Sequence, residues 1–169
     1  MTASDPLEFL GEEFLTWLWF CIETRGGDFD LPGDRAVGVS FDDFLAFAPR
    51  DDDETEHTLK KGTPSRSAEA STALRSGHRL RRAKLIVGQG QLLWSFVLDG
   101  PTMSILNARL PADDPDSESA GERSMDRIRG FLELQQIVAA LYRVFLLERL
   151  APAYMQQGAT AQASWMATR

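Results

Sequence analysis

The sequence predicts an α+β fold, in which an antiparallel β-meander or sheet is packed by a hydrophobic N-terminal helix and a long C-terminal helix. Two patterns carry this prediction. Apolar residues recur at helical spacing over residues 6–25 and 125–150. Between them, residues 79–110 contain three apolar runs with the alternation of strands, separated by glycine-containing turns. A chain of 169 residues is long enough to bury a core without disulfides or metals.

The first helix has clear end signals. Asp5 can cap its first turn, Pro6 suits the first helical position, and Gly26 suits the residue that follows the last turn. Apolar side chains cover almost its whole circumference, so we expect it to be covered on more than one side. Its apolar run is much shorter than the roughly 20 residues that span a bilayer, which predicts no membrane anchor. We therefore predict a homo-oligomer or a complex with a partner protein, whose interface includes Trp17, Trp19, Phe20, Tyr142 and Phe145.

A hairpin is expected directly after this helix. Residues 28–31 and 35–41 flank Pro32-Gly33-Asp34, which is a turn sequence. Residues 42–49 continue the second strand either as a strand or as a short helical turn, and their periodicity does not separate the two.

A further strand and a short helix precede the meander. Residues 54–61 have the composition of a strand, and the following Gly-Thr-Pro sequence ends it. Ser65 or Ser67 then caps an alanine-rich helix that ends at Gly77.

The three strands of the meander are expected at 79–87, 91–98 and 103–110. The sequence Gly88-Gln89-Gly90 forms the first turn, and Asp99-Gly100-Pro101 forms the second. Arginine and lysine side chains alternate between both faces of the first strand. Such a pattern suits an edge strand, where charge prevents pairing with another sheet.

The rest of the chain completes a single domain over residues 1–156. Residues 111–121 are polar and acidic, and we expect a mobile linker there. The last helix follows over 125–150, and Pro152 ends it. Residues 157–169 are small and polar apart from Trp165, which predicts a flexible tail.

Charge is unevenly distributed. The formal net charge is −7, but 8 of the 18 lysines and arginines fall within 25 residues, between two acidic stretches. This basic island has two interpretations: a solvated face balanced by nearby acids, or a surface that contacts a nucleic-acid backbone. Its members are Lys60, Lys61, Arg66, Arg75, Arg79, Arg81, Arg82 and Lys84.

Catalytic and cofactor motifs are missing from the sequence. His57 and His78 have no zinc-site spacing, the acidic run at 51–54 lacks the alternation of a calcium loop, and there is no phosphate loop or nucleophile elbow. Cys21 is the only cysteine and lies in an apolar stretch, which suggests a buried thiol in a reducing compartment. No signal peptide is recognisable. We therefore expect a cytoplasmic, non-enzymatic protein without metal or cofactor.

Three segments resemble the C-terminal half of the recombination-associated RdgC family. They are Leu10-Gly11-Glu12-Glu13-Phe14-Leu15-Thr16-Trp17-Leu18-Trp19, Arg75-Ser76-Gly77-His78-Arg79-Leu80-Arg81-Arg82-Ala83-Lys84-Leu85, and Trp94-Ser95-Phe96-Val97-Leu98-Asp99 with residues 106–110. The order of predicted elements is also similar, and the resemblance covers residues 8–150. It implies a non-enzymatic protein of the kind that forms ring-shaped dimers, encircles duplex DNA without sequence preference and restrains recombinases.

The sequence therefore leaves two hypotheses for the function. The first is an RdgC-like module that assembles with itself or a partner, in DNA recombination, DNA maintenance or phage defence, and contacts the DNA backbone through the basic island. The alternative is a protein-interaction or assembly subunit that binds no nucleic acid. Binding to a duplex that weakens with salt would separate them, because only backbone contacts release counterions.

Overall fold

The structure, a computed structural model, describes residues 6–49, 55–111 and 119–169. The predicted cap Asp5, the acidic run at 51–54 and most of the predicted linker lie outside these ranges. Helix α1 (Pro6–Arg25) is followed by the strands β1 (Asp28–Leu31), β2 (Arg35–Ala48) and β3 (His57–Lys60), and then by helix α2 (Ala68–Arg75). The strands β4 (Arg79–Gln89), β5 (Leu92–Asp99) and β6 (Ser104–Arg109) precede the helices α3 (Ala120–Leu150) and α4 (Ala159–Thr168).

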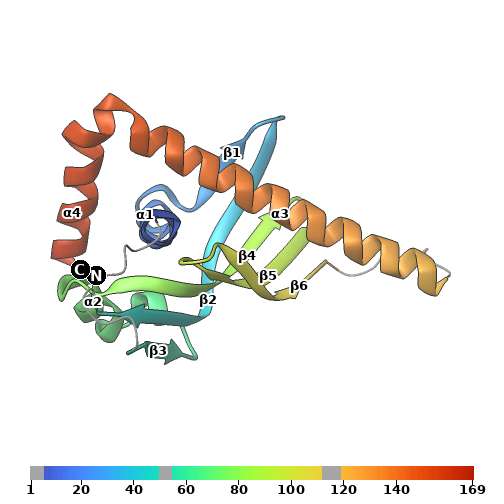
Figure 1. Ribbon diagram of the computed structural model, residues 1–169, viewed down its shortest axis with the longest axis horizontal. Coiled ribbons are helices and arrows are strands. Elements are labelled where there is room, and N and C mark those ends of the chain that lie inside the picture. The colour runs from blue at the N-terminus through green and yellow to red at the C-terminus, as the bar shows by residue number, and fades with distance from the viewer. Residues whose placement is uncertain (1–5, 50–54, 112–118) are drawn as a thin grey trace.

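The strands form one antiparallel sheet in the order β1-β2-β4-β5-β6, and β3 pairs with the end of β2. Figure 1 shows α1 and α3 on the same side of this sheet. The α+β fold with an N-terminal and a long C-terminal helix is thus confirmed. The open question at residues 42–49 is also answered, because β2 runs without a break from the hairpin through Ala48.

The edge position predicted for the 79–87 strand is wrong. β4 pairs with β2 on one side and with β5 on the other; Ile86, for example, lies opposite both Ser40 and Ser95. β1 and β6 stand at the two ends of the strand order. β2 is long enough to pair with β1, β3 and β4. The charges on β4 therefore do not protect a sheet edge.

The core lies between the sheet and the two helices. Leu45, Leu80 and Leu85 of β2 and β4 are buried, and Trp94 and Phe96 of β5 continue the same face. On the helical side, α3 contributes one buried stripe, formed by Leu134, Ile137, Leu141 and Phe145. The indole nitrogen of Trp94 donates a 3.0 Å hydrogen bond to the carbonyl of Gly130, which joins β5 to the middle of α3.

Three aromatic residues expected at a partner interface belong instead to this core. Trp17, Trp19 and Phe145 are exposed by only 1%, 0% and 1%. Trp17 and Phe145 pack against each other, with ring centroids 5.5 Å apart. Phe20 and Tyr142 are half-buried. The prediction of a partner over Trp19 fails because this chain itself covers the second side of α1.

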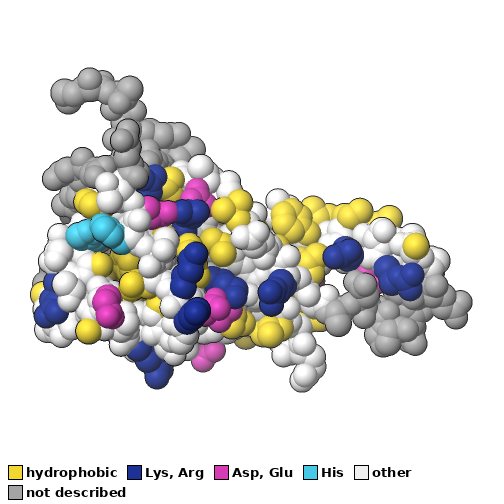
Figure 2. All heavy atoms as spheres, turned by 90° about the horizontal axis from the view of Figure 1, so that it is seen from below, with side chains coloured by type: hydrophobic (Ala, Val, Ile, Leu, Met, Phe, Trp, Pro, Cys, Tyr) yellow, Lys and Arg dark blue, Asp and Glu magenta, His cyan; other side chains and the backbone are white. Residues whose placement is uncertain are grey.

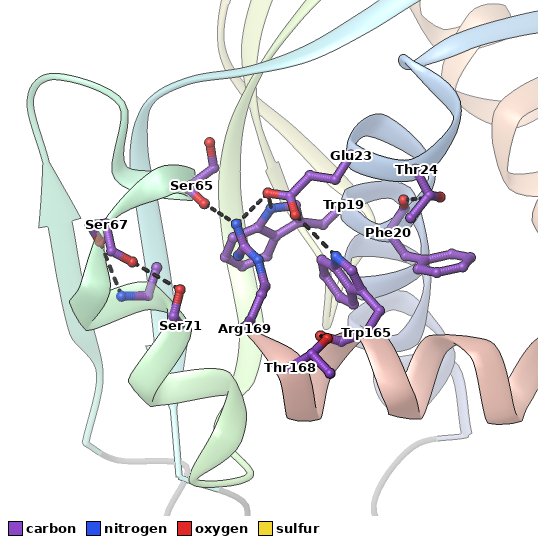
Figure 3. A network of polar contacts seen from close by, with 11 residues as sticks. Trp19, Phe20, Glu23, Thr24, Ser65, Ser67, Ser71, Trp165, Thr168 and Arg169 are labelled. Atoms are coloured by element: carbon purple, nitrogen blue, oxygen red, sulfur yellow. Dashed lines mark hydrogen bonds and ion pairs between the residues drawn. The ribbon is translucent and has the colours of Figure 1, made fainter.

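The element that covers it is α4, in the segment predicted as a flexible tail. Instead of a tail, residues 159–168 form a helix that packs against α1. Figure 3 shows Glu23 of α1 at the centre of the contact, where it accepts hydrogen bonds from the indole nitrogens of Trp19 at 2.9 Å and Trp165 at 3.0 Å. The guanidinium of Arg169 stacks on Trp19, 4.3 Å from its ring centroid, and also pairs with Glu23.

The long helix begins earlier than its apolar pattern predicts. Ser119 is its N-cap, and its hydroxyl accepts from the backbone of Glu122 while the Glu122 carboxylate accepts from the backbone of Ser119. This capping box starts α3 at Ala120, inside the predicted linker. The N-terminal end of α3 extends past the edge of the sheet (Figure 1).

Candidate nucleic-acid interface

The eight residues of the basic island do not form one surface. Lys60 ends β3, Lys61 follows it in a turn, and Arg66 lies in a short 3₁₀ helix at Pro64–Arg66. Arg75 is in the last turn of α2. The other four, Arg79, Arg81, Arg82 and Lys84, belong to β4.

Two of the β4 cations face the helices. Arg79 and Arg81 both pair with Glu12 of α1, at 2.8 Å and 3.3 Å. The Glu12 carboxylate is only 3% exposed, so these contacts balance a charge inside the protein. β4 has an irregularity at this point: Ala46 lies opposite Arg82 and Phe47 opposite Leu80, which leaves Arg81 as the extra residue.

The other two β4 cations face the opposite side of the sheet. Arg82 pairs with Glu56 through two hydrogen bonds, which raise the pKa of its guanidinium. Lys84 pairs with Asp42 at 2.8 Å and Asp43 at 2.9 Å. The hydrogen bond to Asp42 contributes most to a raised pKa of the Lys84 ammonium, and the hydrogen bond to Asp43 raises it further.

The cations outside β4 are exposed. Lys60, Lys61, Arg66 and Arg75 all have high solvent exposure, and the Lys60 ammonium lies 5.7 Å from the ring centroid of Phe44. Figure 2 shows lysine and arginine side chains next to acidic ones on the face seen there, with no uninterrupted basic stripe. For the β4 cations to contact phosphates, their ion pairs with carboxylates would have to break. The cost of breaking these pairs offsets much of the free energy gained from the phosphate contacts.

The structure also places the cysteine and the two histidines that the sequence analysis considered. Burial raises the pKa of the Cys21 thiol to about 12, so its thiolate is not populated at neutral pH. Within the described ranges no three histidine, cysteine, aspartate or glutamate residues are grouped closely enough to hold a metal ion. His57 and His78 lie side by side, with ring centroids 5.9 Å apart.

An apolar surface on α3 is the feature that the site prediction missed. Met125, Ile128, Phe131 and Leu132 are exposed by 51%, 55%, 36% and 51%, and we call them the α3 stripe. Met125, Ile128 and Leu132 are spaced by three and four residues, so they share one side of the helix. Periodicity did indicate this line of residues, but it could not show that the sheet ends before reaching them.

α3 is also long and apolar enough to cross a membrane by length and composition, with 28% of its most apolar window buried. This is weak evidence, because the core helix of a soluble protein can meet the same criteria.

Comparison with protein-family models and with curated protein sequences finds no match to this chain. The resemblance to the RdgC family therefore rests only on the segments quoted from the sequence.

Proposed function

We propose that this protein is a non-catalytic assembly module that associates with a second copy of itself through the α3 stripe. The observation that best supports this proposal is the distribution of exposed apolar side chains. Of the nine large hydrophobic side chains exposed in the described residues, six lie on α3: Met125, Ile128, Phe131, Leu132, Leu147 and Leu150. Four of these six form the α3 stripe, and exposed apolar patches are typical of interaction sites.

Charge favours a second copy as the partner. Residues 120–133 contain three acidic and three basic side chains, so the exposed half of α3 has no net charge. Two copies of this segment do not repel each other, and oppositely charged side chains flank the stripe in both. A helix that binds an anionic membrane or a nucleic acid carries a strongly basic polar face, which is not the pattern here. The three-and-four spacing of the stripe suits the packing of one helix against another.

Polar substitutions within the stripe test this assembly. We expect the wild-type protein to sediment as a dimer at micromolar concentration, and the double variant Ile128→Asn/Leu132→Asn to sediment as a folded monomer, because it removes the central contacts. Leu93→Asn is the matched control, since Leu93 is 58% exposed on β5, away from α3. A monomeric wild type would refute the proposal, and so would a dimer that the double variant leaves intact.

The nucleic-acid function is the second candidate, and four exposed cations are the observation that favours it. If the chain binds duplex, we expect Lys60, Lys61, Arg66 and Arg75 to carry the binding, since each β4 cation already pairs with a carboxylate.

For the assembly module we expect no retention of a labelled duplex at physiological salt. Titration of the duplex at several salt concentrations measures this directly. Binding that weakens steeply with salt, and that is lost when the four exposed cations are replaced by alanine, would instead support the DNA-backbone function.

A further inference from the structure

A cavity of about 730 Å³ lies between α1, the end of α2 and α4. Its size falls within the range of small-molecule sites, roughly 300–1,000 Å³. The cavity exists because α4 lines it with alanines at four-residue intervals, Ala159, Ala163 and Ala167. A larger side chain at any of these positions would fill it. The cavity is distant in sequence from the α3 stripe and independent of the proposed assembly.

Its polar wall is a set of paired charges with a positive balance. Glu12 and Glu13 contribute two negative charges, and Arg75, Arg79 and Arg149 contribute three positive ones. Arg149 pairs with Glu13 at 3.0 Å, and Arg79 pairs with Glu12 at 2.8 Å. These pairs leave the Arg75 charge without an acidic counterpart on the wall.

Hydrogen-bonding capacity gathers at one end of the cavity. The Nδ1 atom of His78 is inaccessible to solvent and has no hydrogen-bond partner in the described part of the chain. Arg75 is exposed, and its guanidinium makes one long contact of 3.5 Å to the hydroxyl of Thr72. Both residues line the cavity at the end of α2. Because water does not reach the Nδ1 atom, a ligand in the cavity does not reach it either, and the accessible donor at this end is the Arg75 guanidinium.

Most of the remaining wall is apolar. Leu74 and Met166 line the cavity together with the alanines of α4, and Leu74 is buried. A ligand that fits this arrangement has one anionic group and an apolar body.

We propose that this cavity binds a small amphipathic carboxylate, whose carboxylate group lies at Arg75 and whose hydrocarbon body lies along Leu74, Met166 and the alanines of α4. The guanidinium donates charge-assisted hydrogen bonds to the carboxylate.

Octanoate and octylammonium are matched probes, since they share a hydrocarbon chain and differ in charge. We expect octanoate to cause saturable amide shifts in the NMR spectrum of the full chain, confined to the segments that line the cavity, residues 12–16, 74–79, 149–154 and 159–167, with a millimolar or lower Kd. Octylammonium is expected to bind at least about tenfold more weakly, because it meets the positive end of the cavity. Equal binding of the two probes would overturn the assignment of an anion site, and no saturable shift with octanoate would overturn the cavity as a binding site.

Two variants locate the binding. Ala163→Trp is expected to abolish the octanoate shifts by filling the cavity, whereas Ala161→Trp, at an exposed position of the same helix that does not line the cavity, should keep them. Because Ala163→Trp could disturb the packing of α4, Arg75→Gln provides a test at an exposed side chain. It should weaken octanoate binding about tenfold and leave octylammonium binding unchanged or stronger. Unchanged octanoate binding in both Ala163→Trp and Arg75→Gln would refute the proposal.

Discussion

Replacing Glu12 with alanine is expected to lower the free energy of unfolding by about 3–5 kcal/mol, the usual cost of breaking a buried ion pair by removing one partner. Glu12 is 3% exposed and balances two arginines, Arg79 and Arg81. Without the carboxylate, two guanidinium groups remain close together beneath α1 and lose their shared ion pair with Glu12. Glu12→Gln should have a similar effect, because the amide keeps the shape of the side chain but not its charge.

The neighbouring residue offers a matched control. Glu13 also pairs with an arginine, Arg149 at 3.0 Å, but its side chain is 28% exposed. Glu13→Ala is therefore expected to cost no more than about 1 kcal/mol, as for solvent-exposed ion pairs. Urea unfolding of both variants, followed by tryptophan fluorescence, measures the difference. Equal losses would show that burial does not govern the strength of these pairs.

Periodicity was sufficient to predict the principal elements. The alternating residues of β4 and β5 and the helical spacing in α1 and α3 each follow from one local requirement, the burial of an apolar face. The same alternation placed Arg79 and Arg81 on one side of β4 and Arg82 and Lys84 on the other. The carboxylates that each group contacts agree with this, since Glu12 belongs to α1 and Asp42 and Asp43 to β2.

Long-range pairing could not be read in the same way. β4 has the charge pattern of an edge strand yet lies inside the sheet, because its arginines meet carboxylates that are distant in sequence, such as Glu12 and Glu56. The helix at 159–168 was missed for a related reason. Its alanines and polar residues show no apolar face, and what fixes it is the contact of Trp165 with Glu23. With α4 absent from the prediction, Trp19 lacked a cover and a partner protein was inferred for it.

Close approach between α1 and the turn after β5 leads to a second large expected effect. Gly11 of α1 faces Gly100, and a Cβ atom at Gly11 would lie 1.8 Å from the carbonyl oxygen of Gly100. The turn has little room to move, because the Gly100 backbone also donates a 2.7 Å hydrogen bond to Arg81. Gly11→Ala is therefore expected to reduce the free energy of unfolding by about 3 kcal/mol, the upper end of the usual cost of overpacking.

Helix propensity alone predicts the opposite, because alanine stabilises a helix by about 1 kcal/mol relative to glycine. Gly130 of α3 separates the two effects. A Cβ atom there would meet Leu110 at 3.7 Å, which is ordinary van der Waals contact, so Gly130→Ala should stabilise the protein by up to about 1 kcal/mol. The glycine-to-alanine substitution is thus expected to change the free energy of unfolding in opposite directions in two helices that cover one sheet. Thermal and urea unfolding of both variants test this, and a stabilising Gly11→Ala would mean that α1 does not lie against the Gly100 turn.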